Sequence, residues 1–272
     1  MEKNSVLVDK VVGLLEQANL PTYLHRFGPK TYAFYQHALA LFIKQECKLS
    51  FRRVSSLLRG LGLNVPTYSA LSKMSKRIPL WIWKLLLRLS ANAQAFAIGA
   101  MDSAFFSRTN PSFHYLKRID SDLPVSKPVQ VNVLIDTCSQ KVLSLRVRAE
   151  RAHDTRDVKY LLENAKRFPK ILVADKGYDS NKVHEYAKHR GIITMIPIRK
   201  RVHKGFYRNY MKKYFNERIY HRRSLVETMF SSVKRRSGGS VFCHKARSQR
   251  AEIYARFITN NLKIVKKKEI FN

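Results

Sequence analysis

The residues in this sequence best suited to catalysis are two aspartates at the ends of apolar segments. Asp102 ends the apolar run of residues 96–102, and Asp175 directly follows the apolar run 171–174. If these runs are adjacent parallel strands, the two carboxylates lie together at the carboxyl edge of a sheet. Acidic residues that converge in this way bind metal ions roughly 4 Å apart, which support phosphoryl transfer. A turn or helix-capping aspartate gives the same local pattern, so each position also has that simpler interpretation.

A third carboxylate belongs to a spaced set of four residues near the carboxyl end. Tyr220, Arg223, Glu227 and Lys234 follow one another at spacings of three, four and seven residues. At about 100° per residue, a helix brings these side chains into an arc of roughly 60°. A separate apolar stripe on the same helix consists of Leu225, Val226, Met229, Phe230 and Val233. One helix can therefore seal a core while presenting a stacking ring, a metal ligand and two phosphate-binding cations. A solvated charged face is the alternative interpretation.

Four other polar residues near these segments have structural interpretations. Asp154 and Asp179 directly precede predicted helices, which we expect them to cap. Asp136 lies in a predicted hairpin turn. His153 could approach the site, but a single histidine is more often structural.

The elements that must position the candidate residues follow an α/β pattern after residue 96. Short apolar or β-branched runs predict strands at residues 96–102, 129–135, 142–147, 170–174 and 192–198. Helical patterns occur at residues 154–167, 180–190, around Glu227 and at 246–265, the first opening with a segment that resembles a capping box. This order predicts an α/β fold in which helices flank a mixed sheet.

The first 95 residues predict helices alone. Two helices are expected near residues 8–15 and 32–43, and a third at 50–61 with Ser50 as its cap. After Gly60 and Gly62, a basic helix is expected at 66–77. Helix, short turn and basic helix at about residues 50–77 are typical of a helix-turn-helix DNA reader, although a plain helical hairpin has the same signature. We therefore expect an all-helical N-terminal DNA-binding region, 1–95, and a catalytic domain, 96–272.

The charge of the chain indicates a polyanionic partner. Lysine and arginine number 52 against 19 acidic residues, which gives a formal net charge of +33. Such an excess repels itself unless phosphates neutralise it, so double-stranded DNA is the expected partner. The most apolar run, 78–89, contains Lys84 and Arg88 and is too short to span a bilayer, so no membrane association is expected. Three cysteines without CxxC spacing give no sign of a zinc site and suit a cytoplasmic protein.

These residues carry a resemblance to a known family. The set Tyr220, Arg223, Glu227 and Lys234 matches the Y-R-E-K signature of a group of prokaryotic insertion-sequence DDE transposases. Asp102-Ser-Ala resembles the first aspartate motif of that group, and Asp175-Lys-Gly-Tyr178 resembles the second. Residues 65–72 and 248–252 are also similar to segments of such proteins, so the likeness extends from about residue 30 to 262.

The resemblance implies a ribonuclease-H-like catalytic domain with two Mg²⁺ or Mn²⁺ ions held by Asp102, Asp175 and Glu227. It also implies that Arg223 and Lys234 hold phosphates of the transposon end and that Tyr220 packs against DNA there. The family usually has threonine where Ala104 stands, which leaves the metal ligand intact and removes one local hydrogen bond. The interval from Asp175 to Glu227 is too short for the large β-rich insertion of some relatives.

The function expected from these features is that of a DNA transposase, in the cytoplasm and associated with the nucleoid. It would bind the inverted-repeat ends of an insertion sequence, cleave them by metal-dependent hydrolysis, and join the freed 3′-hydroxyl to target DNA. A homodimer is expected in the DNA complex. The alternatives are an endonuclease or junction resolvase of the same fold without strand transfer, and an inactive transposase-derived DNA-binding protein.

Overall fold

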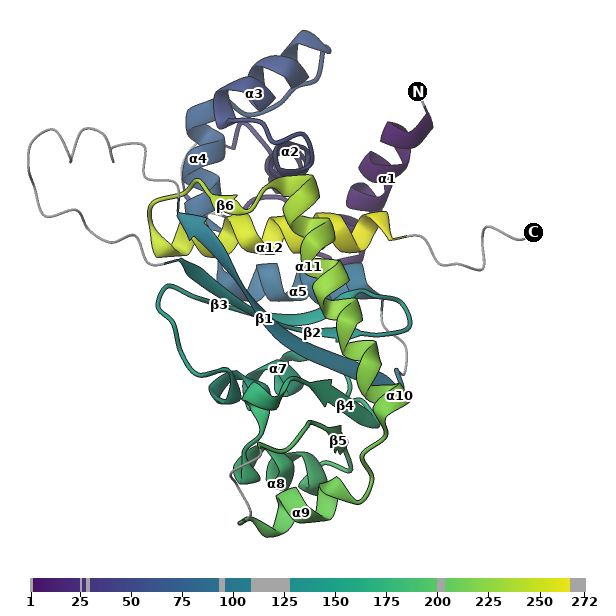
Figure 1. Cartoon of the computed structure of the whole chain (residues 1–272). Helices are drawn as coiled ribbons and strands as arrows, with labels where there is room; N and C mark the ends of the chain where they lie inside the picture. Colours follow the sequence, from purple (N-terminus) through teal and green to yellow (C-terminus); the bar gives the residue numbers. More distant parts are fainter. Residues whose placement is uncertain are drawn as a thin grey trace, which may run out of the picture.

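A computed structural model describes residues 2–24, 26–27, 30–92, 96–108, 128–199 and 204–264 of the chain, with the side chains from residue 7 onward (Figure 1). The basic run at 266–268 lies outside the described residues, as does the predicted domain boundary at 93–95. None of the described helices combines the length and apolarity that crossing a bilayer requires.

The N-terminal region is helical, as predicted. Ser50 begins α3 by accepting a hydrogen bond from the Arg53 amide, and Thr67 begins α4 in the same way with the Ala70 amide. Helices α3 and α4 are thus joined by a short turn through Gly62, whose φ of +75° suits glycine, and their identity as a DNA-reading helix-turn-helix stays a prediction. The helices of this region are α1 (Glu2–Gln17), α2 (Phe34–Glu46), α3 (Phe51–Gly60), α4 (Tyr68–Arg77) and α5 (Leu80–Ala91).

The predicted mixed sheet is confirmed, with the strand order β3-β2-β1-β4-β5. The long strand β1 pairs antiparallel with β2 and parallel with β4, while β2 and β3 form the predicted hairpin. Asp136 makes the hairpin turn as predicted, accepting hydrogen bonds from the amides of Cys138 and Ser139. The strands are β1 (Ile98–Arg108), β2 (Val129–Asp136), β3 (Val142–Arg148), β4 (Ile171–Ala174), β5 (Ile193–Met195) and β6 (Ser240–Val241).

Two predicted strand boundaries are wrong. Asp102 was expected to end its strand, but β1 continues to Arg108 because β2 pairs with it as far as Phe106 and β6 pairs with its last two residues. The fifth strand is shorter than predicted, since only residues 193–195 pair with β4. Asp102 therefore lies in the middle of a strand rather than in a loop.

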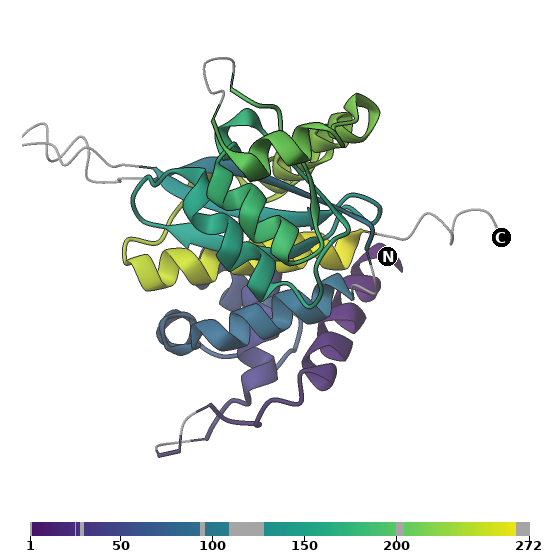
Figure 2. The same ribbon diagram turned by 90° about the horizontal axis from the view of Figure 1, so that it is seen from below.

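One face of the sheet is covered by α7 (Val158–Asn164) and α8 (Asn181–His189) (Figure 2). The predicted capping box at 154–157 is wrong: this segment is a 3₁₀ turn, and Asp157 is buried, accepting from Arg148 at 2.6 Å and from Asn132 at 2.6 Å. Asp154 accepts from Gln130 at 2.8 Å. Both carboxylates instead accept hydrogen bonds from polar side chains of β2 and β3.

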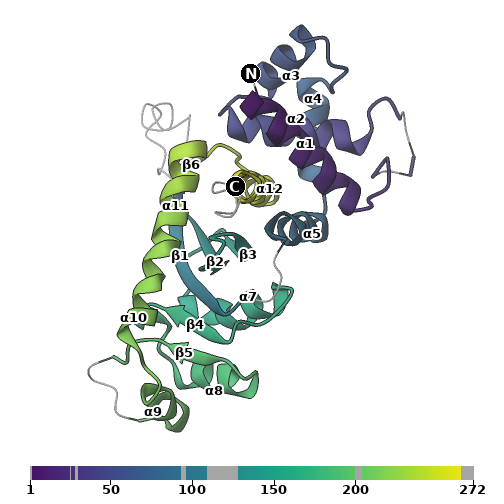
Figure 3. The same ribbon diagram turned by 90° about the vertical axis from the view of Figure 1, so that its right-hand side faces the viewer.

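The other face is covered by α11 (Ser224–Ser237) and α12 (Ala246–Lys263), and α12 is the central helix of the molecule. Figure 3 shows α12 between the sheet and the N-terminal helices. Fourteen of its residues are buried, as a helix enclosed on all sides requires. The N-terminal helices and the sheet thus share one hydrophobic core. The division into domains at residue 95 stays a prediction.

Polar contacts fix α12 to both parts of the chain. Asn261 hydrogen bonds to the backbone of Val142 on β3 and to Ser90 of α5. Lys263 pairs with Glu46 of α2. Arg247 donates to the carbonyl of Arg77, the last residue of α4, at 3.2 Å. The last residue of α4 is therefore attached to the same helix that supports the sheet.

Candidate active site

The two aspartates converge because β1 and β4 are adjacent and parallel. Met101 is paired with Ala174, so the residues that follow them lie side by side, Asp102 within β1 and Asp175 directly after β4. Asp175 also accepts a hydrogen bond from the Lys176 amide at 2.6 Å, which begins the 3₁₀ turn Lys176–Tyr178. Asp175 therefore caps this turn while lying beside Asp102, and its role as a metal ligand stays a prediction.

The third carboxylate reaches the same place from α11. The predicted single helix is divided: Tyr220 ends α10 (Glu217–Tyr220), Arg223 lies in a 3₁₀ turn, and Glu227 lies in the first turn of α11. The apolar stripe is confirmed, since Val226 and the other buried residues of this face pack into the core. The divided helix still presents Arg223 and Glu227 on one side.

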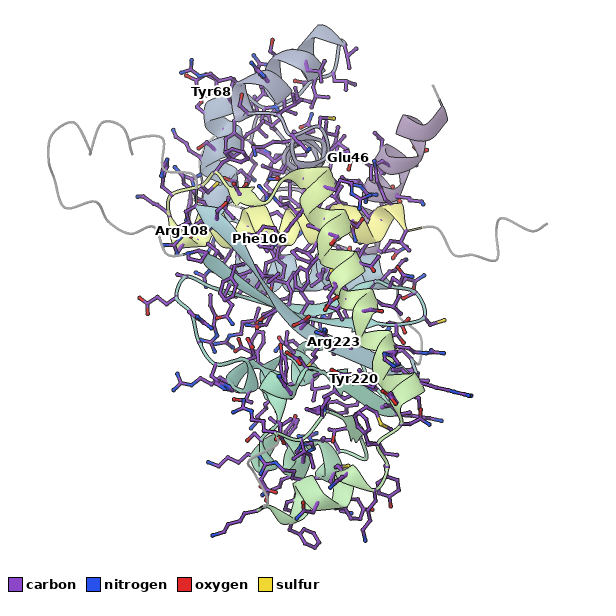
Figure 4. All side chains as sticks on the ribbon, in the orientation of Figure 1. Glu46, Tyr68, Phe106, Arg108, Tyr220 and Arg223 are labelled. Atoms are coloured by element: carbon purple, nitrogen blue, oxygen red, sulfur yellow. The ribbon has the colours of Figure 1, made fainter. Side chains whose placement is uncertain are left out.

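Arg223 joins the carboxylates of β1 and α11. Its Nη1 donates to Oδ2 of Asp102 at 3.2 Å, and its Nη2 donates to Oε1 of Glu227 at 2.5 Å. Oδ1 of Asp102 accepts from the Ser103 amide at 2.8 Å. Figure 4 shows Arg223 and Tyr220 beside β1, away from Phe106 and Arg108 near the far end of that strand.

Tyr220 lies at the same site, whereas Lys234 does not. Burial raises the pKa of Tyr220, the charges of Asp175 and Asp102 raise it further, and Arg223 opposes them. The ring of Tyr220 is 5.6 Å from that of Phe215, between ring centres. Lys234 lies about two turns further along α11, with its ammonium 5.3 Å from the ring of Phe106.

The site is crowded with negative charge. The pKa of Asp102 is raised, chiefly by burial and further by the charges of Asp175 and Glu227. The Ser103 amide and Arg223 lower this pKa, but they do not reverse the shift. Burial alone would lower the pKa of Arg223, but the charges of Asp102 and Glu227 outweigh it and raise the pKa. Burial is the largest cause of the shift at Asp102, and the two neighbouring carboxylates add to it, which favours a cation between them.

The three carboxylates fit Mg²⁺ or Mn²⁺ by chemical type. Both ions prefer oxygen ligands, and a divalent charge would relieve the repulsion that acts on Asp102. Within the described parts of the chain, however, no three acidic, histidine or cysteine side chains are spaced as a finished metal cage. Ligation by Asp102 and Glu227 therefore requires their side chains to move, and Arg223 with them.

A buried ion cluster behind Asp175 was missed in the sequence. Asp179 was predicted to cap α8, but Ser180 has that position, and Asp179 is buried, contacting Arg208 at 2.6 Å and His184 at 3.2 Å. Arg199 donates to the carbonyls of Lys176 and Gly177, the first two residues of the turn after Asp175. These contacts fix the turn that carries Asp175.

Only the position of Asp179, four residues after Asp175, offered a signal for this cluster in the sequence. Arg199 and Arg208 have no distinctive spacing. His153, expected to be structural, accepts from the Thr155 amide at 3.4 Å, and its other ring nitrogen is 3.4 Å from Arg199.

A groove of about 780 Å³ runs along the exposed face of α11 beside Glu227. Four of the side chains that line it carry hydroxyl groups and two carry guanidinium groups, and both kinds of group donate hydrogen bonds to phosphates. Its lining consists of Ser224, Glu227, Thr228, Ser231, Ser232, Arg235 and Arg236.

The fold and the site define the class. In the five-strand path, β2 runs antiparallel to the other four strands, and the carboxylates lie on β1, after β4 and on a following helix. This is the arrangement expected of a ribonuclease-H-like enzyme. A family model for the transposase DDE domain matches residues 98–262, more than half of the chain. The chain therefore belongs to the DDE transposase family.

A solved structure supports the fold. The chain is similar to piggyBac transposase, solved by cryo-electron microscopy as a synaptic complex with hairpin DNA, with a TM-score of 0.53 and 10% sequence identity. The likeness covers 97% of this chain and 73% of that one. At this identity it shows the fold alone, and it confirms the ribonuclease-H-like sheet preceded by helices. No curated protein sequence matches the chain.

Proposed function

We propose that this DDE transposase belongs to the prokaryotic insertion-sequence group with the Y-R-E-K signature. It binds the inverted-repeat ends of its element, cleaves them hydrolytically, and joins the freed 3′-hydroxyl to target DNA. The observation that carries this proposal is the convergence of Asp102, Asp175 and Glu227 at one place, from two adjacent parallel strands and a helix.

Asp102, Asp175 and Glu227 are the residues that would hold two Mg²⁺ or Mn²⁺ ions. When bound, such ions activate the attacking oxygen and stabilise the leaving oxygen of an in-line displacement. The buried cluster around Asp179 fixes the turn that carries Asp175, and β1 fixes Asp102. The ligands are thus supported by rigid elements, as a site that must hold its geometry through two successive displacements requires.

DNA is held by the surfaces on either side of the carboxylates. Tyr220 packs against the DNA end, and Arg223 and Lys234 bind its phosphates. The hydroxyl and guanidinium groups of the α11 groove follow the same backbone. On α4, the exposed residues Ser69, Lys73 and Lys76 share one helical face, which suits them to enter the major groove.

Two further features belong to this proposal. The protein acts as a homodimer in the DNA complex, with one protomer at each end of the element. It acts in the cytoplasm, associated with the nucleoid.

The test is a strand-transfer assay. The protein receives a pre-cut element end with a free 3′-hydroxyl and a supercoiled plasmid in Mg²⁺, and joined product is measured. The proposal expects joining by the wild type and none by Asp102→Asn. If the wild type nicks the plasmid yet never joins the end, the protein is a nuclease of the same fold.

Lys234 provides a second test of the same proposal. Lys234→Ala should weaken end binding by about 1.5–3 kcal/mol, which is the range for a charge-assisted contact. Strand transfer should fall more than non-specific nicking, because only joining requires the end to stay bound after cleavage. An equal loss in both reactions would remove Lys234 from end binding.

A further inference from the structure

Arg223 occupies oxygens that metal ligation would use. Of the two oxygens of Asp102, Oδ1 accepts from the Ser103 amide at 2.8 Å and Oδ2 from Arg223 at 3.2 Å. Oε1 of Glu227 accepts from the other guanidinium nitrogen of Arg223 at 2.5 Å. The guanidinium thus joins two of the three carboxylates from the position of a shared cation.

A divalent ion and Arg223 cannot both be bound there at full strength. They would compete for the same oxygens, and their positive charges would repel each other at short range. If Arg223 left the carboxylates and found no other partner, its charged guanidinium would remain unpaired beside the site. The guanidinium therefore needs a second anionic partner before the carboxylates become free.

A DNA phosphate is the partner that the surroundings favour. The side chain of Arg223 is 25% exposed, so it can turn outward. Arg222 is exposed beside it, and Arg235 and Arg236 line the groove along the same helix. This basic surface concentrates phosphates, and a guanidinium binds phosphate with the same two-pronged geometry as it binds carboxylates.

We propose that Arg223 exchanges between the Asp102–Glu227 pair and a DNA phosphate, so that DNA and the divalent metal ion promote each other's binding. This inference rests on the proposed function, because it takes the carboxylates as metal ligands. Because binding free energies are reciprocal, the factor by which DNA tightens metal binding equals the factor by which metal tightens DNA binding. Arg223 thereby delays loading of the site until DNA is present.

The first experiment measures Mn²⁺ binding to the full chain without DNA, by electron paramagnetic resonance of the free ion. Arg223→Gln should bind Mn²⁺ roughly tenfold more tightly than the wild type, the lower end of the range for losing a charge-assisted competitor. Arg218→Gln is the matched control, since Arg218 is an exposed cation on α10 that has no part in the proposed site. It should leave Mn²⁺ affinity within about twofold of the wild type.

The second experiment repeats the titration with a 30-base-pair duplex at saturating concentration, after subtraction of the Mn²⁺ bound by the duplex alone. The wild type should gain about tenfold in Mn²⁺ affinity, and Arg218→Gln should gain as much. Arg223→Gln should gain little, because its carboxylates are already free. Thermal unfolding of each variant confirms that it is folded, and Arg223→Lys, which keeps the charge without the two-pronged contact, should give an intermediate Mn²⁺ affinity.

The outcomes separate this inference from the proposed function. If Arg223→Gln binds Mn²⁺ no more tightly than the wild type, or more weakly, Arg223 supports the ligands instead of competing for them and the inference is wrong. If Asp102→Asn still removes Mn²⁺ binding in that case, the proposed metal site stands. If Asp102→Asn binds Mn²⁺ like the wild type, the proposed metal site fails.

Discussion

Replacement of Arg208 by methionine should destabilise the protein more than any change on the outer face of the same helix. Arg208, on α9 (Phe206–Lys212), donates to the buried carboxylate of Asp179 at 2.6 Å and to the carbonyl of Lys204 at 2.6 Å. The side chain of Asp179 is fully buried. Methionine keeps most of the apolar volume but removes the charge, so Asp179 loses its main counter-ion.

The loss of unfolding free energy in Arg208→Met depends on the hydrogen-bond donors that Asp179 keeps. Breaking a buried pair from one side typically costs 3–5 kcal/mol. Asp179 keeps two donors, the Arg199 amide at 3.0 Å and His184 at 3.2 Å, so the lower end of about 3 kcal/mol is expected. For a chain of this size, each kcal/mol lowers Tm by about 2–4 °C, which predicts a fall of about 6–12 °C.

The assay is thermal and urea unfolding of Arg208→Met, with Lys212→Met as the control on the exposed side of α9. The control should change the free energy of unfolding by less than about 0.5 kcal/mol. The double variant Asp179→Asn/Arg208→Met should be more stable than Arg208→Met, because it removes the unpaired buried charge. A loss below about 1 kcal/mol in Arg208→Met, or one equal to the control, would refute the argument that this pair fixes the turn after Asp175.

Three further predictions concern catalysis, binding and acid stability. Asp102→Asn, Asp175→Asn and Glu227→Gln should each abolish cleavage in Mg²⁺ and leave DNA binding in a gel-shift assay nearly intact; full cleavage by any of them would exclude that residue as an essential ligand. If six to ten phosphates are neutralised, DNA affinity should fall on the order of 10³–10⁵-fold between 50 and 200 mM salt, and a flat response would mean that the +33 charge serves another purpose. Burial lowers the pKa of His184, so the unfolded chain binds a proton that the folded chain does not, and the free energy of unfolding should fall as pH drops below about 6.5. Urea unfolding at pH 7.5 and 5 should show a smaller fall for His184→Gln than for the wild type, and equal falls would contradict this assignment.

The sheet could be predicted because its signals are local. Runs of β-branched residues predict β2, β3 and β4. The position of Asp175 directly after the apolar run Ile171–Ala174 predicts its place at the end of β4. The end of β1 could not be predicted in this way, because its last residues pair with β6, which follows more than 130 residues later. The length of β1 is set by tertiary pairing and not by its own sequence.

In the candidate site, too, the local spacing of residues could be predicted and the contacts between distant segments could not. The spacing of Arg223 and Glu227 placed them on one side, and the structure joins them as an ion pair. Lys234 lies on the same arc of the helix, but a shared arc does not mean a shared height along the helix axis. Its ammonium therefore lies over Phe106 and not beside the carboxylates. The cluster of Asp179, His184 and Arg208 could not be predicted, because its members come from segments that only the folded chain brings together.

The position of α12 has a consequence for where the DNA is cut. Helix α12 packs on the sheet, and it is also attached to α4 through Arg247 and to α2 through Lys263. Helix α4 therefore cannot turn freely relative to the carboxylates. In the proposed function, the base pairs that α4 reads and the phosphate that is cleaved are then separated by a fixed distance. Insertion of two base pairs between the recognised sequence and the cleavage point would then move the cut into the element, and deletion of two base pairs would move it out into the flanking DNA.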